Sequence, residues 1–207
     1  QSVFEKRYGD CKGMANLAKE MLKRAGYDAR LTWIGTKRIM YDHSIPSLGI
    51  NNHMICTVFL NGKSYYLDPT EKYIPFGENA ERIQDRPVMI EDGQKFIAQK
   101  IAGTDISHHT DFRKLTATIN GENLEGSYHI TLKGESRKDF LYYYHYTQSD
   151  KQQDFLTSFL GNGNSSMKPT NLQLPDLGKR KGDLAIDCDL VLSGAVSAFN
   201  DEIYVDI

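Results

Sequence analysis

The first part of the chain carries a hydrophobic pattern with helical spacing. Asp10 is a residue type that commonly caps the N-terminus of a helix, and Gly26 suits the position just after a helix ends. Cys11 lies on the apolar stripe between them. The other apolar positions of this stripe are Met14, Leu17, Ala18, Met21, Leu22 and Ala25. The pattern predicts a helix that begins at Cys11 and turns this thiol toward the body of the domain.

A strand and a long irregular segment follow this helix. Residues 28–35 alternate between apolar and polar side chains, which predicts a strand. Residues 36–50 show no period, and a segment of that length is more often functional than a shorter loop. Within it, Tyr41, Asp42 and His43 could line a cleft or could be ordinary surface residues.

The clearest hairpin signal of the chain comes next. Residues 52–60 and 63–70 read as strands, and the dipeptide Asn61-Gly62 between them favours a two-residue turn. Residues 88–90 and 96–101 predict a second pair of strands around a Glu-Asp-Gly turn. The segment 103–111 is poor in apolar residues and is interpreted as a linker. Its two histidines, His108 and His109, are expected to be solvated.

The pattern after the linker predicts a second folded region. Two helices are expected to begin at capping boxes, one at Ser136 with Asp139 and one at Asp150 with Gln153. Strands are expected at residues 115–119, 127–132, 171–174, 184–192 and 203–207. Clean alternation over 184–192 indicates one buried face, with Cys188 on it. The tyrosines at 142, 143, 144 and 146 suggest either a helix face packed on the sheet or an aromatic binding platform.

Composition narrows the class of protein. The chain has 207 residues, 40% hydrophobic residues and a net charge of −2, as in an ordinary globular protein. No basic patch indicates nucleic acid, and no apolar run approaches the roughly 20 residues of a membrane span. We therefore expect no nucleic-acid partner and no direct insertion into a membrane.

Three cysteines, at positions 11, 56 and 188, are too few and too scattered for a disulfide framework. No pair of them has the spacing of a zinc site, so we expect neither a metal nor a cofactor. Cys56 and Cys188 fall on apolar strand faces and are predicted to be core residues. Cys11 is different because the first turn of a helix favours a thiolate, the nucleophilic form of cysteine. The alternative is that Cys11 is a small buried apolar residue.

Turn chemistry places an acid beside a base. If Asn61 and Gly62 are the two turn residues, Leu60 pairs with Lys63 and Ile55 pairs with position 68. His53 shares the face of Ile55, so His53 and Asp68 become diagonal neighbours across the two strands, about 7 Å apart at Cβ. Together with Cys11 they supply the nucleophile, base and orienting acid that thiol catalysis requires.

Three motifs in this order resemble the bacterial transglutaminase-like superfamily. They are the Gly-Asp-Cys-Lys run at 9–12 before a helix, Asn-His at 52–53 opening a strand, and Leu-Asp-Pro-Thr at 67–70 followed by residues 73–77. The resemblance covers roughly residues 4–90 and is particularly similar to multidomain proteins of Bacteroidetes. It implies a papain-like α+β core in which Cys11 is the nucleophile, His53 the general base and Asp68 the residue that orients His53.

The resemblance also sets expectations for the rest of the chain. We expect a truncated papain-like core in residues 1–105, with a helix on an antiparallel sheet, and a second α+β domain rich in antiparallel strands in residues 112–207. The second domain resembles, more weakly, a domain of unassigned function that follows the core in these bacterial proteins. The family has helices before the cysteine, so the missing N-terminal segments of the parent chain are expected partners. The family also suggests a periplasmic or secreted location in a Gram-negative bacterium.

The function expected from these residues is cysteine-dependent acyl transfer on a peptide, protein or other amide substrate. Release of the acyl group to water would make the domain a peptidase or amidase, and release to an amine would make it a transglutaminase. The alternative is a non-catalytic binding or assembly module that keeps the scaffold. An intact Cys11, His53 and Asp68 set favours the enzyme, because a module without turnover is free to lose any of the three.

Overall fold

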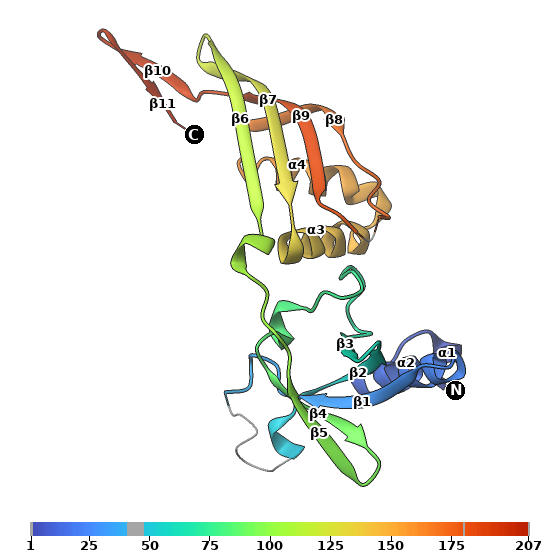
Figure 1. The fold of residues 1–207 in the computed structure, drawn as a ribbon. Helices are drawn as coiled ribbons and strands as arrows, with labels where there is room; N and C mark the ends of the chain where they lie inside the picture. The colour runs from blue at the N-terminus through green and yellow to red at the C-terminus, as the bar shows by residue number, and fades with distance from the viewer. Residues whose placement is uncertain (1, 41–47, 180, 207) are drawn as a thin grey trace. The chain divides into compact units, whose positions relative to one another are not determined.

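The computed structural model describes residues 2–40, 48–179 and 181–206, and the chain in it is a mixed α+β protein (Figure 1). It divides into two compact units, residues 1–105 and 106–207. The boundary lies within the segment 103–111, where η3 (Ile106–His108) connects the units. Tyr41, Asp42 and His43, interpreted above as possible cleft residues, lie outside the described residues.

The first unit is one antiparallel sheet with a helix packed on it. The helices are α1 (Ser2–Lys6) and α2 (Cys11–Arg24), and the strands are β1 (Asp28–Ile34), β2 (His53–Leu60), β3 (Lys63–Leu67), β4 (Pro87–Asp92) and β5 (Lys95–Lys100). The strand order is β3-β2-β1-β4-β5. Two short 3-10 helices, η1 (Leu48–Ile50) and η2 (Glu81–Ile83), lie in the connections. Helix α2 packs on β1 and β2.

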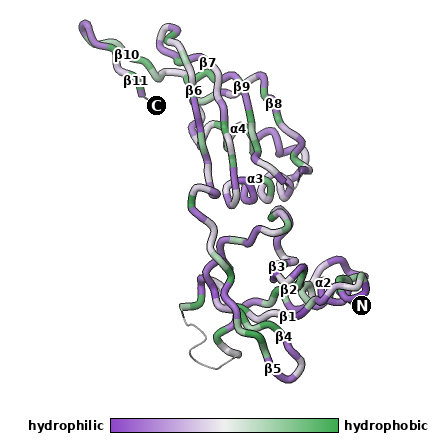
Figure 2. Tube along the Cα trace, in the orientation of Figure 1, coloured by the Kyte–Doolittle hydropathy of each residue, from purple (hydrophilic) through white to green (hydrophobic). Residues whose placement is uncertain are grey.

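The two faces of this sheet have different cores. Along β2, residues 54 to 58 are all buried, so the strand is covered on both sides. On one face, Ile55 of β2 packs with Ile34 and Ile90 and with Ile83 of η2. Cys56 points to the other face. That face is covered by α2, since the charge of Lys19 from this helix acts on the Cys56 thiol. Figure 2 colours the chain by the hydropathy of each residue, with hydrophobic residues in green.

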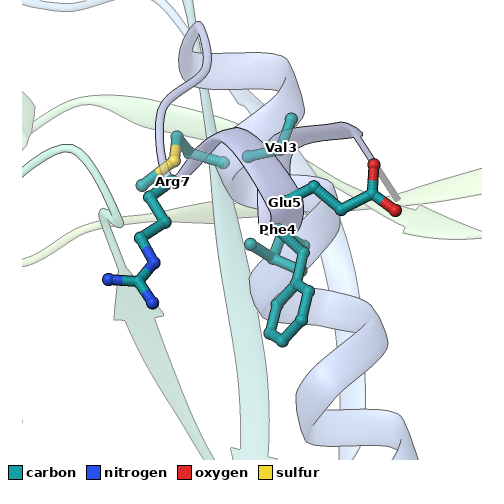
Figure 3. A pocket seen from close by; sticks show the side chains of 6 residues that line it. Val3, Phe4, Glu5 and Arg7 are labelled. Carbon is teal, nitrogen blue, oxygen red and sulfur yellow. The ribbon is translucent and has the colours of Figure 1, made fainter.

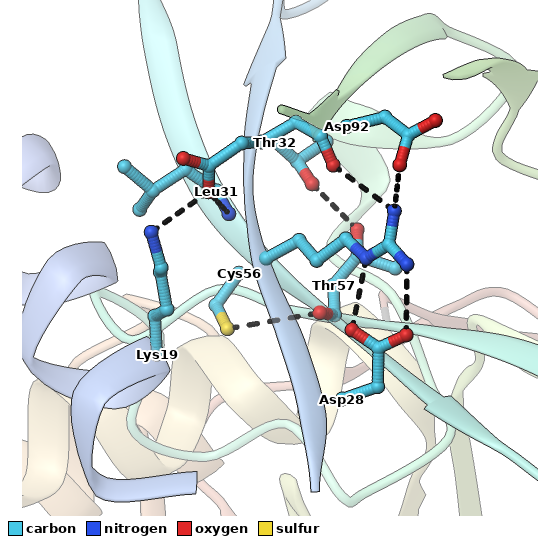
Figure 4. A network of polar contacts seen from close by, with 9 residues as sticks. Lys19, Asp28, Leu31, Thr32, Cys56, Thr57 and Asp92 are labelled. Atoms are coloured by element: carbon cyan, nitrogen blue, oxygen red, sulfur yellow. Dashed lines mark hydrogen bonds and ion pairs between the residues drawn. The ribbon is translucent and has the colours of Figure 1, made fainter. Parts of the chain in front are cut away.

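A network of charged and polar groups ties α2 to the sheet (Figure 4). Lys19 Nζ of α2 lies 2.8 Å from Glu91 Oε2 of β4, and the same oxygen accepts a hydrogen bond from the Leu31 amide. Arg30 bridges Asp28 and Asp92 at 2.8 and 2.7 Å. A salt bridge between partly exposed groups contributes only about 0.5 kcal/mol, so each of these contacts stabilises the unit only slightly.

The second unit is a four-stranded antiparallel sheet with two helices on one side and a separate hairpin (Figure 1). Its main strands are β6 (Asp111–Asn120), β7 (Asn123–Leu132), β8 (Met167–Gln173) and β9 (Leu184–Leu192), in the order β6-β7-β9-β8. The helices are α3 (Gly134–Tyr146) and α4 (Gln152–Leu160), with η4 (Ser149–Lys151) between them. The hairpin is β10 (Val196–Phe199) with β11 (Glu202–Val205).

Both predicted capping boxes in the second unit are wrong. Helix α3 begins at Gly134, two residues before Ser136. At this start the Nδ1 atom of His109, which comes from a distant segment, accepts a hydrogen bond from the Glu135 amide. A Cβ on Gly134 would lie 2.4 Å from the His108 carbonyl oxygen, so this close approach needs glycine. Asp150 lies in η4, and no side chain caps α4.

Strand boundaries in the second unit also differ from the prediction. β8 begins at Met167 and contains a bulge near Asn171, whose positive φ interrupts the alternation that the sequence pattern depends on. β11 ends at Val205, and β10 was not predicted. Cys56 and Cys188 are core residues as predicted, with 0% and 5% of their surface exposed. Of the tyrosines, Tyr144 packs on Phe140, whereas Tyr142, Tyr143 and Tyr146 are exposed.

Candidate active site

The start of α2 carries Cys11 as the sequence predicts. The Asp10 Oδ1 atom accepts the Gly13 amide at 2.8 Å, so the cap is formed and Cys11 is the first residue of the helix. The helix ends at Arg24, Ala25 is its C-cap residue, and Gly26 follows with φ +87°. Cys11 is a free, partly exposed thiol. Its sulfur belongs to the first turn of α2, whose amides have no acceptor within the helix.

A hollow of about 440 Å³ lies between α1 and α2, next to this turn (Figure 3). It is lined by Val3, Phe4, Glu5, Arg7, Met14 and Leu17. Met14 stands one helical turn after Cys11, so the two residues share a face of α2. His53 and Asp68 do not line the hollow, which is therefore a space beside the helix start and not a shared cleft.

The hairpin register brings His53 and Asp68 together. The residues of β2 and β3 pair as the Asn-Gly turn predicts, with Leu60 opposite Lys63 and Thr57 opposite Tyr66. His53 Nε2 lies 2.8 Å from Asp68 Oδ2. Only 9% of the His53 side chain and 4% of the Asp68 side chain are exposed. The structure therefore contains a nearly buried imidazole and carboxylate pair.

Asp68 is held on both carboxylate oxygens. Oδ1 accepts hydrogen bonds from the Thr70 amide at 3.1 Å and the Thr70 hydroxyl at 2.6 Å, and Oδ2 accepts from His53 and from Arg82 Nη2 at 2.7 Å. Burial raises the pKa of Asp68, but the hydrogen bonds from His53 and Thr70 and the charges of His53 and Arg82 outweigh it and lower the pKa to about 2. Asp68 is therefore an anion at neutral pH.

The ionised carboxylate determines which nitrogen of His53 carries the proton. A carboxylate can only accept, so the Nε2–H group donates to Asp68 Oδ2. In the neutral imidazole, Nδ1 then holds the lone pair and is the nitrogen able to take a proton. This arrangement suits a general base whose second nitrogen is fixed by an acid.

Asn52 fixes the backbone just before His53. Its Oδ1 atom accepts the Thr36 amide and its Nδ2 atom donates to the Thr36 hydroxyl, both at 2.9 Å. Thr36 is buried, and Arg86 Nε donates to the neighbouring Gly35 carbonyl at 2.6 Å. The start of β2 is thus tied to the end of β1. We call these two Asn52–Thr36 hydrogen bonds the clamp before β2. The sequence patterns predicted neither this clamp nor the contact of Arg82 with Asp68, because the residues concerned lie in segments without a hydrophobic period.

The direction of α2 brings Cys11 to the same end of the sheet as His53. The Lys19 side chain and the Leu31 amide contact the same Glu91 oxygen, and Leu31 pairs with Cys56 across β1 and β2. One turn further along α2, the charge of Lys23 acts on Asp28 at the start of β1. The helix therefore runs parallel to β2. Cys11 lies about 12 Å back along α2 from Lys19, and His53 lies about 10 Å back along β2 from Cys56.

The faces of the sheet add a geometric condition. Helix α2 lies on the face of Cys56, whereas His53 alternates to the face of Ile55. The imidazole can meet the Cys11 thiol only around the end of the sheet. Helix α2 begins at Cys11 and strand β2 begins at His53, so each residue stands at the start of its element.

The other two thiols are unsuited to nucleophilic chemistry. Burial raises the pKa of Cys56 to about 11. Burial, with the charges of Asp189 and Asp187, also raises the pKa of Cys188.

Within the described residues, no group of three or more His, Cys, Asp or Glu side chains is placed to hold a metal ion. No helix in the same residues is long and apolar enough to cross a membrane.

Neither a family model, nor a curated protein, nor a solved structure matches the chain. The assignment of a function therefore depends on the residues of the site and on their geometry.

Proposed function

We propose that the first unit is a thiol-dependent acyl-transfer domain of transglutaminase-like type, acting on an amide group of a peptide or protein. Cys11 is the nucleophile, His53 is the general base and Asp68 orients His53. The observation that carries the proposal is the nearly buried His53–Asp68 pair, with Nε2 on the carboxylate and Nδ1 left as the basic nitrogen.

The first step of the proposed reaction forms a thioester. His53 Nδ1 takes the proton of the Cys11 thiol, and the sulfur attacks the carbonyl carbon of the substrate amide. The negative charge on the carbonyl oxygen is stabilised by amides at the start of α2, among which the Cys11 amide is a candidate. When the C–N bond breaks, the His53 imidazolium returns its proton to the leaving amine.

The second step releases the acyl group. Water or a primary amine attacks the thioester, His53 takes a proton from the attacking atom, and the Cys11 thiolate leaves. Asp68 keeps the imidazole in the tautomer that both steps require and stabilises the imidazolium formed in each. Water gives hydrolysis, and an amine gives transfer.

The test is the rate at which iodoacetamide alkylates each cysteine of the folded protein, read by mass spectrometry of peptides. We expect Cys11 to react at neutral pH at least about tenfold faster than a free model thiol, and His53→Ala to remove the excess. His129→Ala is the matched control and leaves the rate unchanged. A Cys11 rate equal to that of the model thiol in the wild-type protein would exclude an activated thiolate.

A second measurement identifies the acceptor. The protein is incubated with glutamine-containing peptides, with and without a primary amine, and products are identified by mass. Covalent incorporation of the amine, lost in Cys11→Ser, supports transfer, and ammonia or peptide release without incorporation supports hydrolysis. A protein with an activated Cys11 but no product from any amide substrate would favour a binding module.

A further inference from the structure

We propose that Arg82 is a positioning residue that keeps His53 in its neutral, basic form by sharing the oxygen of Asp68 that His53 uses. This inference rests on the proposed function, since it concerns how the same pair is tuned. Arg82 Nη2 lies 2.7 Å from Asp68 Oδ2, 2.8 Å from the Thr70 hydroxyl and 3.0 Å from Glu71 Oε1.

The backbone under Arg82 is held independently of the pair. Arg82 is the middle residue of η2, and the next residue, Ile83, is fully buried in the core of the sheet. The Arg82 carbonyl accepts the Lys37 amide at 2.8 Å, and Lys37 Nζ lies 2.5 Å from Glu81. The guanidinium thus reaches Asp68 from an element outside the β2–β3 hairpin whose backbone has its own contacts.

Two cationic groups converge on one carboxylate oxygen when His53 is protonated. His53 Nε2 and Arg82 Nη2 lie 2.8 and 2.7 Å from Asp68 Oδ2, so they are at most about 5.5 Å apart. An arginine remains protonated throughout the working pH range. Its fixed charge therefore stabilises the Asp68 anion and opposes a second positive charge on the imidazole.

Glu71 completes an alternating row of charge. Its carboxylate contacts the same Arg82 nitrogen, Nη2, that contacts Asp68, and only 16% of the Glu71 side chain is exposed. The row runs His53, Asp68, Arg82, Glu71. Removing Arg82 exposes His53 to an unshared Asp68 charge and favours the imidazolium, whereas removing the Glu71 charge has the opposite effect.

The test is NMR titration of the His53 ring signals, assigned by their absence in His53→Gln. In Arg82→Met we expect the titration midpoint of His53 to move up by about one pH unit, and in Glu71→Gln to move down by a few tenths. Arg82→Lys, which keeps the charge, stays closer to the wild type than Arg82→Met. Arg30→Met, which removes an arginine from another ion pair of the sheet, leaves the midpoint unchanged.

The outcomes separate this inference from the proposed function. An unchanged midpoint in a folded Arg82→Met protein overturns the role of Arg82. If Arg82→Met does not fold, Glu71→Gln decides, and a midpoint that stays or moves up overturns the role. If the midpoints move as expected but Cys11 alkylation follows none of them, Arg82 tunes His53 as inferred and the proposed acyl transfer fails.

Discussion

Each unit of this protein contains a cysteine, a histidine and an aspartate, but the two sets differ in burial, in hydrogen bonding and in the place of the thiol. In the second unit, His129 Nδ1 lies 2.7 Å from Asp187 Oδ1, a distance as short as that of the His53–Asp68 pair. Cys188 is the residue after Asp187. A short histidine–aspartate contact, even with a nearby cysteine in sequence, is therefore not sufficient for a site.

Burial and the second imidazole nitrogen separate the two pairs. The side chains of His129 and Asp187 are 40% and 56% exposed, so water competes for their charges. His129 Nε2 is also occupied, by the Thr131 hydroxyl at 2.9 Å. In the first unit, by contrast, the carboxylate takes Nε2 and Nδ1 holds the lone pair.

The place of the thiol is the third difference. Cys188 alternates to the apolar face of β9, opposite Asp187, and is buried there. It cannot reach His129 without unfolding the strand. Cys11 is the first residue of a helix, at the end of its sheet. A thiol at an element boundary can approach a base from another strand, whereas a thiol inside a strand is committed to one face.

The comparison is tested most strongly by removing the acid from each pair. Asp68→Ala leaves His53, Thr70 and Arg82 without the acceptor they share, in a nearly buried place, so we expect the free energy of unfolding to fall by about 3 kcal/mol. Asp187→Ala should cost less than about 1 kcal/mol, since the pair is exposed. Urea denaturation measures both. Equal losses would mean that burial does not distinguish the pairs.

Acid titration of stability sharpens the same comparison. Because the folded pKa of Asp68 is lowered from 3.8 to about 2, its ionisation stabilises the folded state above about pH 4, and this stabilisation is lost as pH falls toward 2. The loss amounts to about 2 kcal/mol. Denaturation at several pH values should show it in the wild type and in Asp187→Asn.

Asp68→Asn is the decisive variant for that titration. It has no carboxylate at position 68, so its stability should fall less between pH 5 and pH 2 than that of the wild type, by the same 2 kcal/mol. Asp28 and Glu91, whose pKa values are lowered by hydrogen bonds with Arg30 and Lys19, contribute equally to both proteins and cancel. Identical pH profiles would show that Asp68 is not the group responsible.

Local patterns were enough to predict the parts of the site that depend on neighbours in sequence. Asp10 caps the helix because its side chain reaches an amide three residues on, and Asn61 and Gly62 adopt the positive φ values that a tight hairpin turn needs. The register that follows places His53 at Asp68. The α+β class, which was expected from the resemblance, is also confirmed.

The supporting shell of the pair could not be predicted in this way. Arg82 contacts Asp68 from 14 residues away and Thr36 contacts Asn52 from 16, across segments with no regular period. The same limit explains α3, where a tertiary contact from His109 overrides the local signal at Ser136. Long-range contacts between irregular segments leave no periodic trace in a sequence.

The smallest test concerns this supporting shell, and it uses the same substitution in each unit. Thr36→Val removes the hydroxyl that accepts from Asn52 Nδ2 in a buried place, so we expect a loss of about 1 kcal/mol in unfolding free energy. Thr131→Val removes the hydroxyl next to His129 Nε2, where water can replace it, and should change stability by less than about 0.5 kcal/mol. Chemical denaturation measures both, and NMR of the ring signals reports whether either imidazole moves. If the two losses were equal, the clamp before β2 would not be what holds His53, and the difference between the pairs would lie in Asp68 and Arg82 alone.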